Sequence, residues 1–206
     1  MKKENDLIMS GDGAAKLGFP MWPQFAPETL TDIQEPIKNG LVNYWTGKKG
    51  MEFEEVFAKW QGSKFAISCT NGTAALHTAI ASLGLGPGDE VIVFSPYFVE
   101  YLFYIDNYLG KSVTVKTSYP DFTPDPDEFA LSITSRTKAV IINSPNNPTG
   151  IIYSDGFLRS MADIIDKKQD ELGINILVIA DEPYDKIVYD NGKINGLLNV
   201  AGISAT

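Results

Sequence analysis

Four short stretches of the chain carry side chains suited to holding a small ligand, and each follows a strand-like run. They are Asn71-Gly72-Thr73, Ser95-Pro96-Tyr97-Phe98, Asn143-Ser144-Pro145-Asn146-Asn147-Pro148-Thr149-Gly150 and Asp181-Glu182-Pro183-Tyr184. Open α/β sheets bind ligands at the carboxyl ends of their parallel strands. The placement of these stretches therefore predicts that their side chains meet at one site.

The loop from Asn143 to Gly150 is the most specific of the four. Pro145 and Pro148 fix φ and remove N–H donors, and Gly150 permits a positive φ, so the backbone there is stiff and non-repetitive. Asn, Pro and Gly also dominate ordinary turns, and an Asn-Pro pair alone would indicate a turn. The complete eight-residue string is far more specific than that pair, and Asn147 within it supplies an amide donor.

Each of the other stretches has a purely structural alternative. At a helix start, Gly72 and Thr73 would bind an anion through N–H groups and the positive end of the helix dipole, but small residues also pack a helix against a sheet. Phe98, taken alone, is typical of a core. Asp181 ends an apolar strand, where a buried carboxylate needs a partner, although helix capping would also explain it. Tyr184 adds a phenol beside that carboxylate.

The sequence between these stretches alternates between strand and helix patterns. Such alternation predicts an α/β fold with a three-layer, mostly parallel sheet. The helix near 126 begins with Asp125 as its cap and Pro126 in its first position, and the longest helix begins after Ser154. Strands are predicted at Phe65–Ser68, Glu90–Phe94, Val113–Lys116, Lys138–Ile142 and Ile176–Ala180, and helices near 73–83, 98–108, 126–134 and 155–172.

Residues 1–40 are predicted to form an N-terminal arm with a short helix, and residues 41–206 a partial ligand-binding domain. The short helix would begin at Pro27, and Pro36 must bend or end it. A better helix follows, because apolar residues recur at helical spacing before the stop at Gly62; they are Phe53, Val56, Phe57 and Trp60.

Composition excludes several classes of partner. The net charge is −9, from 26 acidic against 17 basic residues, which argues against nucleic acid and anionic membranes. One cysteine, Cys69, cannot form an internal disulfide and fits a reducing compartment. There is no signal-peptide pattern and no run of membrane-spanning length. A cytoplasmic protein without a metal site is therefore expected.

The motifs resemble the large domain of fold-type I pyridoxal-phosphate (PLP) aminotransferases, along nearly the whole chain. The resemblance implies that PLP is the cofactor and that Asn147 and Tyr184 bond its phenolic oxygen. It also implies that Asp181 pairs with the pyridine nitrogen and keeps it protonated, which makes the ring an electron sink.

The same resemblance assigns the remaining stretches. Phe98 would stack on the ring, and Gly72 and Thr73 would bind the phosphate. The implied reaction moves an amino group from an amino-acid donor to a keto acid or keto-sugar, in an enzyme that is a homodimer when complete.

Two branches of that fold type are represented. Residues about 20–93 and 191–206 resemble the DegT/DnrJ/EryC1/StrS sugar aminotransferases, whereas residues about 95–190 resemble class I aspartate-type enzymes. Both branches share this sheet, so a mosaic is physically tolerable. The sequence therefore predicts a chimera of the two.

The Schiff-base lysine of these enzymes has no counterpart in the chain. Lys186 is the lysine closest to the motifs, and it matches no catalytic position. The chain is accordingly expected to end before that lysine, to lack the C-terminal small domain and to be inactive as it stands. Two alternatives stay open: a non-catalytic PLP-binding fragment, and a nucleotide-binding α/β domain that uses Asn71-Gly72-Thr73 for phosphate.

Overall fold

The structure is a computed structural model that describes residues 23–189, and the chain divides into two compact units, Met1–Val56 and Phe57–Thr206. Each unit is described by itself. No helix among the described residues combines the length and the apolar character needed to cross a membrane. The predicted elements within 1–22 and 190–206 lie outside the described residues.

The first unit contains α2 (Pro27–Asp32) and α3 (Gln34–Asn39), and α4 (Lys49–Gln61) begins in it. The predicted interruption of the first helix is confirmed, since the helix is interrupted at Ile33, between α2 and α3. Pro36 lacks an N–H group and would clash with a preceding turn, so it is tolerated only in the first turn of α3.

A tight turn separates α3 from α4. The Asn43 side chain accepts hydrogen bonds from the N–H groups of Trp45 and Thr46, each 3.0 Å long. A Cβ atom on Gly47 would lie 2.6 Å from the carbonyl oxygen of Leu41, so only glycine fits there.

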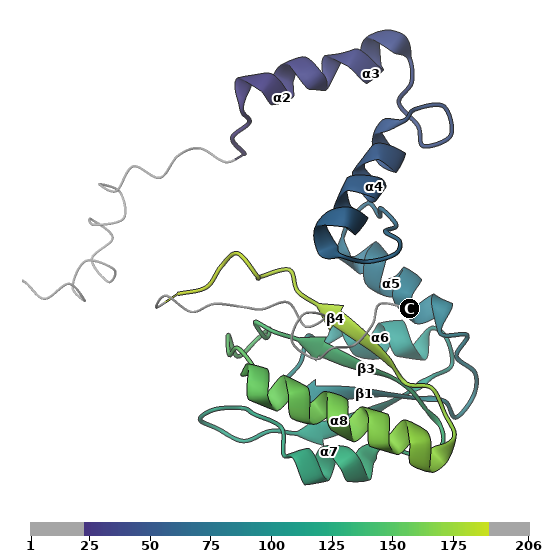
Figure 1. Cartoon of the computed structure of the whole chain (residues 1–206), viewed down its shortest axis with the longest axis vertical. Helices are drawn as coiled ribbons and strands as arrows, with labels where there is room; N and C mark the ends of the chain where they lie inside the picture. Colours follow the sequence, from purple (N-terminus) through teal and green to yellow (C-terminus); the bar gives the residue numbers. More distant parts are fainter. Residues whose placement is uncertain (1–22, 190–206) are drawn as a thin grey trace, which may run out of the picture. The chain divides into compact units, whose positions relative to one another are not determined.

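The second unit is built on a parallel sheet in the order β2-β1-β3-β4 (Figure 1). Because all three pairings are parallel, the carboxyl ends of these strands share one edge. The register of β3 and β4 places Asn143 opposite Asp181 at that edge. The strands are β1 (Glu90–Ser95), β2 (Lys111–Lys116), β3 (Thr137–Asn143) and β4 (Leu177–Asp181).

Helices cover both faces of the sheet, which confirms the predicted three-layer α/β class. On one face, α5 (Gly72–Ser82) and α6 (Glu100–Asp106) contribute Ile80, Tyr101 and Ile105 to a buried cluster. On the other face, α7 (Pro126–Ser132) and α8 (Asp155–Leu172) contribute the second cluster, and Figure 1 shows the two helices side by side there. Members from α7 and α8 include Phe129, Leu158, Met161 and Ile165.

The two predicted helix caps are confirmed by their hydrogen bonds. Asp125 accepts from the N–H groups of Asp127 and Glu128, at 2.7 and 3.2 Å. Ser154 accepts from the N–H group of Phe157 at 3.2 Å. Both side chains satisfy donors that the first turn of a helix leaves without an internal partner.

Replacing Ser154 with alanine is expected to lower the free energy of unfolding by about 1 kcal/mol, because the N–H group of Phe157 loses its acceptor. Chemical denaturation followed by circular dichroism measures this change. Ser154→Asp is the matched control and should retain most of the stability, since aspartate also caps. Equal losses in both variants would show that the cap does not stabilise α8.

One predicted strand is wrong. Phe65–Ser68 belongs to no strand of the described sheet, and the side chains of Phe65 and Ile67 are 73% and 75% exposed. A strand is stabilised by ladder hydrogen bonds to a neighbour, and the described residues supply none to this segment. The alternating apolar pattern of Phe65–Ser68 predicted a paired strand, and this segment pairs with no strand of the described sheet.

Candidate functional site

Asn143 joins the ends of β3 and β4 through its side chain. Its amide Nδ2 donates to the main-chain oxygen of Asp181 at 2.7 Å, and its Oδ1 accepts from the N–H group of Asn147 at 2.6 Å. Asn143 is 5% exposed, so both bonds are shielded from water. Two of the predicted site residues, Asp181 and Asn147, are thus held by one intervening side chain.

The loop that carries Asn147 is closed by its own hydrogen bonds. The side chain of Asn146 accepts from the N–H and the hydroxyl of Thr149, and its main-chain oxygen accepts from Gly150 N–H at 2.7 Å. Gly150 has φ +73°, as this return requires. Tyr153 N–H donates to the hydroxyl of Ser144 at 3.0 Å, which ties the loop back to the chain that follows it.

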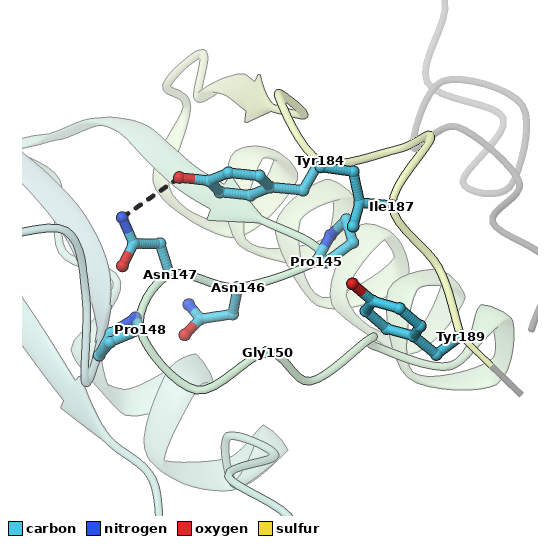
Figure 2. Close-up of a pocket in the computed structure, with 8 residues that line it drawn as sticks. All are labelled: Pro145, Asn146, Asn147, Pro148, Gly150, Tyr184, Ile187 and Tyr189. Carbon is cyan, nitrogen blue, oxygen red and sulfur yellow. Dashed lines mark hydrogen bonds between the residues drawn. The ribbon is translucent and has the colours of Figure 1, made fainter. Parts of the chain in front are cut away.

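Tyr184 and Asn147 face each other across the end of the sheet. The carboxamide Nδ2 of Asn147 lies 3.4 Å from the hydroxyl oxygen of Tyr184, as drawn in Figure 2. A phenol that accepts this bond keeps its own hydrogen, and the carboxamide keeps a second N–H. The pair can therefore offer two neutral donors to one ligand oxygen.

Asp181 is held by a partner that the sequence analysis did not assign to the site. The hydroxyl of Tyr101, on α6, donates to Oδ2 of Asp181, and Tyr101 is 2% exposed. Burial raises the pKa of Asp181, and the hydrogen bond from Tyr101 opposes that rise. Burial and the adjacent Asp181 carboxylate also raise the pKa of Tyr101, so Tyr101 remains a donor.

Phe98 reaches this cluster through the same tyrosine. Its ring packs edge-on against that of Tyr101, with centroids 5.6 Å apart and planes at 81°. Phe98 lies between β1 and α6 and not within the helix that was predicted to begin near it, because α6 begins at Glu100. Tyr101 therefore contacts both the predicted stacking residue and the predicted carboxylate.

Gly72 and Thr73 begin α5, as the phosphate-binding prediction requires. The side chain of Asn71 caps the helix by accepting from Ala74 N–H at 2.9 Å, which leaves the N–H groups of Gly72 and Thr73 at the open end. A Cβ atom on Gly72 would meet no atom within 4 Å, so an anion has room to approach. Thr73 is linked to α6, since its hydroxyl oxygen lies 3.4 Å from that of Tyr104.

A pocket of about 320 Å³ lies beside two of the six predicted residues, Asn147 and Tyr184. The other four, Gly72, Thr73, Phe98 and Asp181, do not line it. Figure 2 shows that the Asn147 carboxamide reaches to the hydroxyl of Tyr184, with Ile187 and Tyr189 on the same segment as Tyr184. The pocket therefore flanks the candidate site and does not enclose it.

Two residues of this arrangement, Asn143 and Tyr101, were missed as site residues by the sequence analysis. Asn143 ends an apolar strand just as Asp181 does, and that parallel was available in the sequence. Tyr101 stands three residues after Phe98, and in the helix predicted near 98–108 this spacing would put both residues on one side. The bond from Tyr101 to Asp181 joins residues 80 positions apart, and no local pattern predicts it.

The comparisons with known proteins agree with this geometry. The sequence model of the DegT/DnrJ/EryC1/StrS aminotransferase family matches residues 23–144 of this chain. The chain belongs to this family of aminotransferases. Its fold is that of the fold-type I enzymes, whose cofactor is PLP, and the predicted family resemblance is thereby confirmed.

Curated relatives of this chain include aspartate aminotransferases. The aspartate aminotransferase of Thermotoga maritima is 34% identical over 97% of this chain and 53% of the relative, and that of Geobacillus stearothermophilus is 36% identical over 93% and 50%. A solved aspartate aminotransferase from Thermus thermophilus, with maleate, has a TM-score of 0.70 and 27% identity over 96% of this chain and 54% of that one. The chain spans about half the length of the curated relatives it matches.

These matches cross the boundary at which the mosaic was predicted. The family match continues from residue 23 to residue 144, and the match to the Thermotoga enzyme covers 97% of the chain. The aminotransferase assignment therefore holds on both sides of residue 94. The chimera stays a prediction.

The described residues fit PLP by the chemistry of their donors and acceptors. The half-buried carboxylate of Asp181 keeps one oxygen beyond the bond from Tyr101 and suits a protonated ring nitrogen. The donor pair of Asn147 and Tyr184 suits a phenolate oxygen. The open helix start at Gly72 suits a phosphate.

Proposed function

We propose that the chain is the large-domain part of a PLP-dependent aminotransferase, in which Asp181, Asn147 and Tyr184 hold the cofactor ring. The observation that carries this proposal is the hydrogen-bonded connection of Asp181 to Asn147 through Asn143, which joins the ends of β3 and β4. The Tyr184 hydroxyl lies 3.4 Å from the amide of Asn147, so three predicted ligand groups belong to one network.

In this proposal each residue holds a different part of the cofactor. Asp181 holds a proton at the pyridine nitrogen, and Asn147 and Tyr184 donate to the phenolic oxygen. Phe98 stacks against the ring, and its edge-on contact with Tyr101 fixes the plane of its own ring. The first turn of α5 binds the phosphate; the residues are Gly72 and Thr73.

PLP supplies, when bound, an electron sink for the electrons released at the α-carbon of an amino acid. The chain contributes by holding that sink in its protonated form. A carboxylate that stays ionised in a desolvated site stabilises a positive charge on the ring nitrogen more strongly than water would. Tyr101 assists because its hydrogen bond favours the ionised form of Asp181.

Titration of PLP into the chain, followed by absorbance and by fluorescence quenching, tests this proposal. We expect saturable binding that Asp181→Ala weakens, and a visible band in the intact gene product that borohydride fixes to the protein. Thermal stabilisation by a nucleotide and not by PLP would instead support the nucleotide-binding alternative. Saturable PLP binding with no fixable band in the intact gene product would support a non-catalytic PLP-binding role.

The non-catalytic PLP-binding role is favoured by the surroundings of Lys186. Its ammonium lies 2.8 Å from the carboxylate of Asp185 and 5.6 Å from the ring centroid of Trp60, and its side chain is 78% exposed. These contacts hold it in a surface ion pair. Lys186 is therefore assigned no catalytic role, and the covalent attachment of PLP is sought in the intact gene product.

The remaining parts of the proposal concern the whole protein. The donor is an amino acid and the acceptor a keto acid or a keto-sugar, since the relatives include both aspartate-type enzymes and the sugar-related family. The proposed assembly is a homodimer, with residues 1–40 as an arm and 41–206 as the large domain. A cytoplasmic location fits the single cysteine, Cys69, which is exposed and free.

Replacing Tyr184 with phenylalanine is expected to weaken PLP binding about tenfold, because one hydrogen bond to a charged oxygen is lost. The dissociation constant from fluorescence quenching measures the effect. Tyr189→Phe is the matched control, as Tyr189 lines the neighbouring pocket and has no role in the proposed site. Equal PLP affinity of Tyr184→Phe and the wild type would show that the Tyr184 hydroxyl does not contribute to PLP binding.

A further inference from the structure

Asn143 links two residues that the proposed function assigns to two different positions of one ring, Asp181 to the ring nitrogen and Asn147 to the phenolic oxygen. Its Nδ2 donates to the main-chain oxygen of Asp181 at 2.7 Å, and its Oδ1 accepts from Asn147 N–H at 2.6 Å. Only one orientation of the carboxamide satisfies both bonds, since a flipped amide would set donor against donor and acceptor against acceptor. The side chain is 5% exposed, so water cannot readily replace either bond.

We propose that Asn143 is a positioning residue, whose carboxamide sets the separation between Asp181 and Asn147. This inference rests on the proposed function for the identity of the ligand and goes beyond it in naming what fixes the geometry. The ring nitrogen and the phenolic oxygen of PLP are separated by a rigid ring, so groups that bind both must be held at a matching distance. Displacements below 1 Å at such groups reduce binding and rate substantially.

The strand register gives this bridge its stiffness. Asn143 and Asp181 are paired residues at the ends of β3 and β4. The bond from the Asn143 side chain therefore adds one hydrogen bond to those that already join the two strands. The bond to Asn147 then turns the chain into the loop, which Asn146 and Thr149 close with bonds of their own. A shift of either strand end is thus transmitted to the amide of Asn147.

Tyr101 acts on one end of this arrangement only. It donates to the carboxylate of Asp181 and has no part in the bonds of Asn143 to Asn147. The two residues therefore make different predictions. Loss of the Tyr101 hydroxyl should affect the titration of Asp181 and leave the Asn147 amide unchanged, whereas loss of the Asn143 carboxamide should affect both.

The test compares Asn143→Ala and Tyr101→Phe in the chain without PLP, by NMR. Hydrogen exchange of the Asn147 amide should accelerate at least tenfold in Asn143→Ala and remain at the wild-type rate in Tyr101→Phe. The carboxyl carbon of Asp181 should titrate at a higher pH in Tyr101→Phe, since a bond to the ionised form is lost. Asn146→Ala is the matched control, because it removes a buried carboxamide that bonds Thr149, and it should leave Asp181 unchanged.

PLP affinity gives the second measurement. Asn143→Ala should weaken PLP binding about tenfold or more, and Asn143→Asp should do so as well, although its carboxylate can still accept from Asn147 N–H. In the unmodified chain the Asn147 amide should exchange slowly, which keeps the inference testable if a variant fails to fold. If Asn143→Ala leaves both the exchange rate of the Asn147 amide and the PLP affinity unchanged, the positioning role of Asn143 is overturned and the proposed function stands. If the wild-type chain does not bind PLP, the proposed function itself is overturned.

Discussion

Replacing Asp181 with alanine is expected to slow amino transfer by the intact gene product about 10³-fold. Removing one partner of a desolvated ion pair costs about 3–5 kcal/mol, which corresponds to rate losses of that size. Asp181→Asn should be nearly as slow, because a neutral amide does not hold a proton on the ring nitrogen. Steady-state kinetics with saturating PLP measures the loss, and Asp163→Ala, an exposed aspartate on α8, is the control.

In the absence of PLP, Asp181→Asn should stabilise the chain at neutral pH. Burial raises the pKa of Asp181 above its ordinary value, with Tyr101 opposing the rise, so the folded state binds a proton more tightly than the unfolded state does. Stability is then lost as the pH rises through the folded pKa. Asp181→Asn cannot ionise, and we expect it to unfold at higher denaturant than the wild type at neutral pH, with the difference vanishing in acid. A less stable Asp181→Asn at neutral pH would contradict this.

Replacing Glu90 with alanine is expected to lower the free energy of unfolding by about 3 kcal/mol, because a buried acid at the start of β1 is removed from several partners. Its side chain is 3% exposed and accepts from the hydroxyl of Thr134 at 2.6 Å and from the guanidinium of Arg136 at 3.0 Å. The ammonium of Lys111 lies 3.7 Å away. Calorimetry should show a melting temperature lower by roughly 6–12 °C.

The pH dependence of this effect has the opposite sign to that of Asp181. Burial raises the pKa of Glu90, but the bonds from Thr134 and Arg136 and the charges of Arg136 and Lys111 outweigh it, and the net pKa is lowered. The stabilisation is therefore present above the ordinary glutamate pKa and is lost as the pH falls through the folded pKa. Arg136→Ala is the control and should cost about 1 kcal/mol, since its side chain is 60% exposed. A constant difference between Glu90→Gln and the wild type down to acid pH would disprove the charge effect.

The two central strands, β1 and β3, could be predicted from the sequence because they are buried on both faces. Continuous apolar runs, such as those of β1 and β3, identify parallel strands covered by helices, and the caps at Asp125 and Ser154 locate the helix starts. The short Phe65–Ser68 segment also has a strand-like local pattern, and it still forms no strand. Pairing depends on a neighbour, which a local pattern does not supply.

The site could be predicted only as a set of chemical groups at one edge of the sheet. The roles of Asp181 and Asn147 follow from the strands that precede them and from the family motif. The connection between them does not, because it depends on register: Asn143 meets Asp181 only if β3 and β4 pair as they do. The contact of Tyr101 with Asp181 likewise depends on how α6 packs against the sheet.

A crystal structure of the chain with PLP tests the central claim most directly. The account predicts the pyridine nitrogen beside the carboxylate of Asp181 and the phenolic oxygen within hydrogen-bonding distance of Asn147 and Tyr184, with the phosphate at the start of α5. PLP bound elsewhere, with its ring nitrogen away from Asp181 and its phosphate away from Gly72, would contradict it.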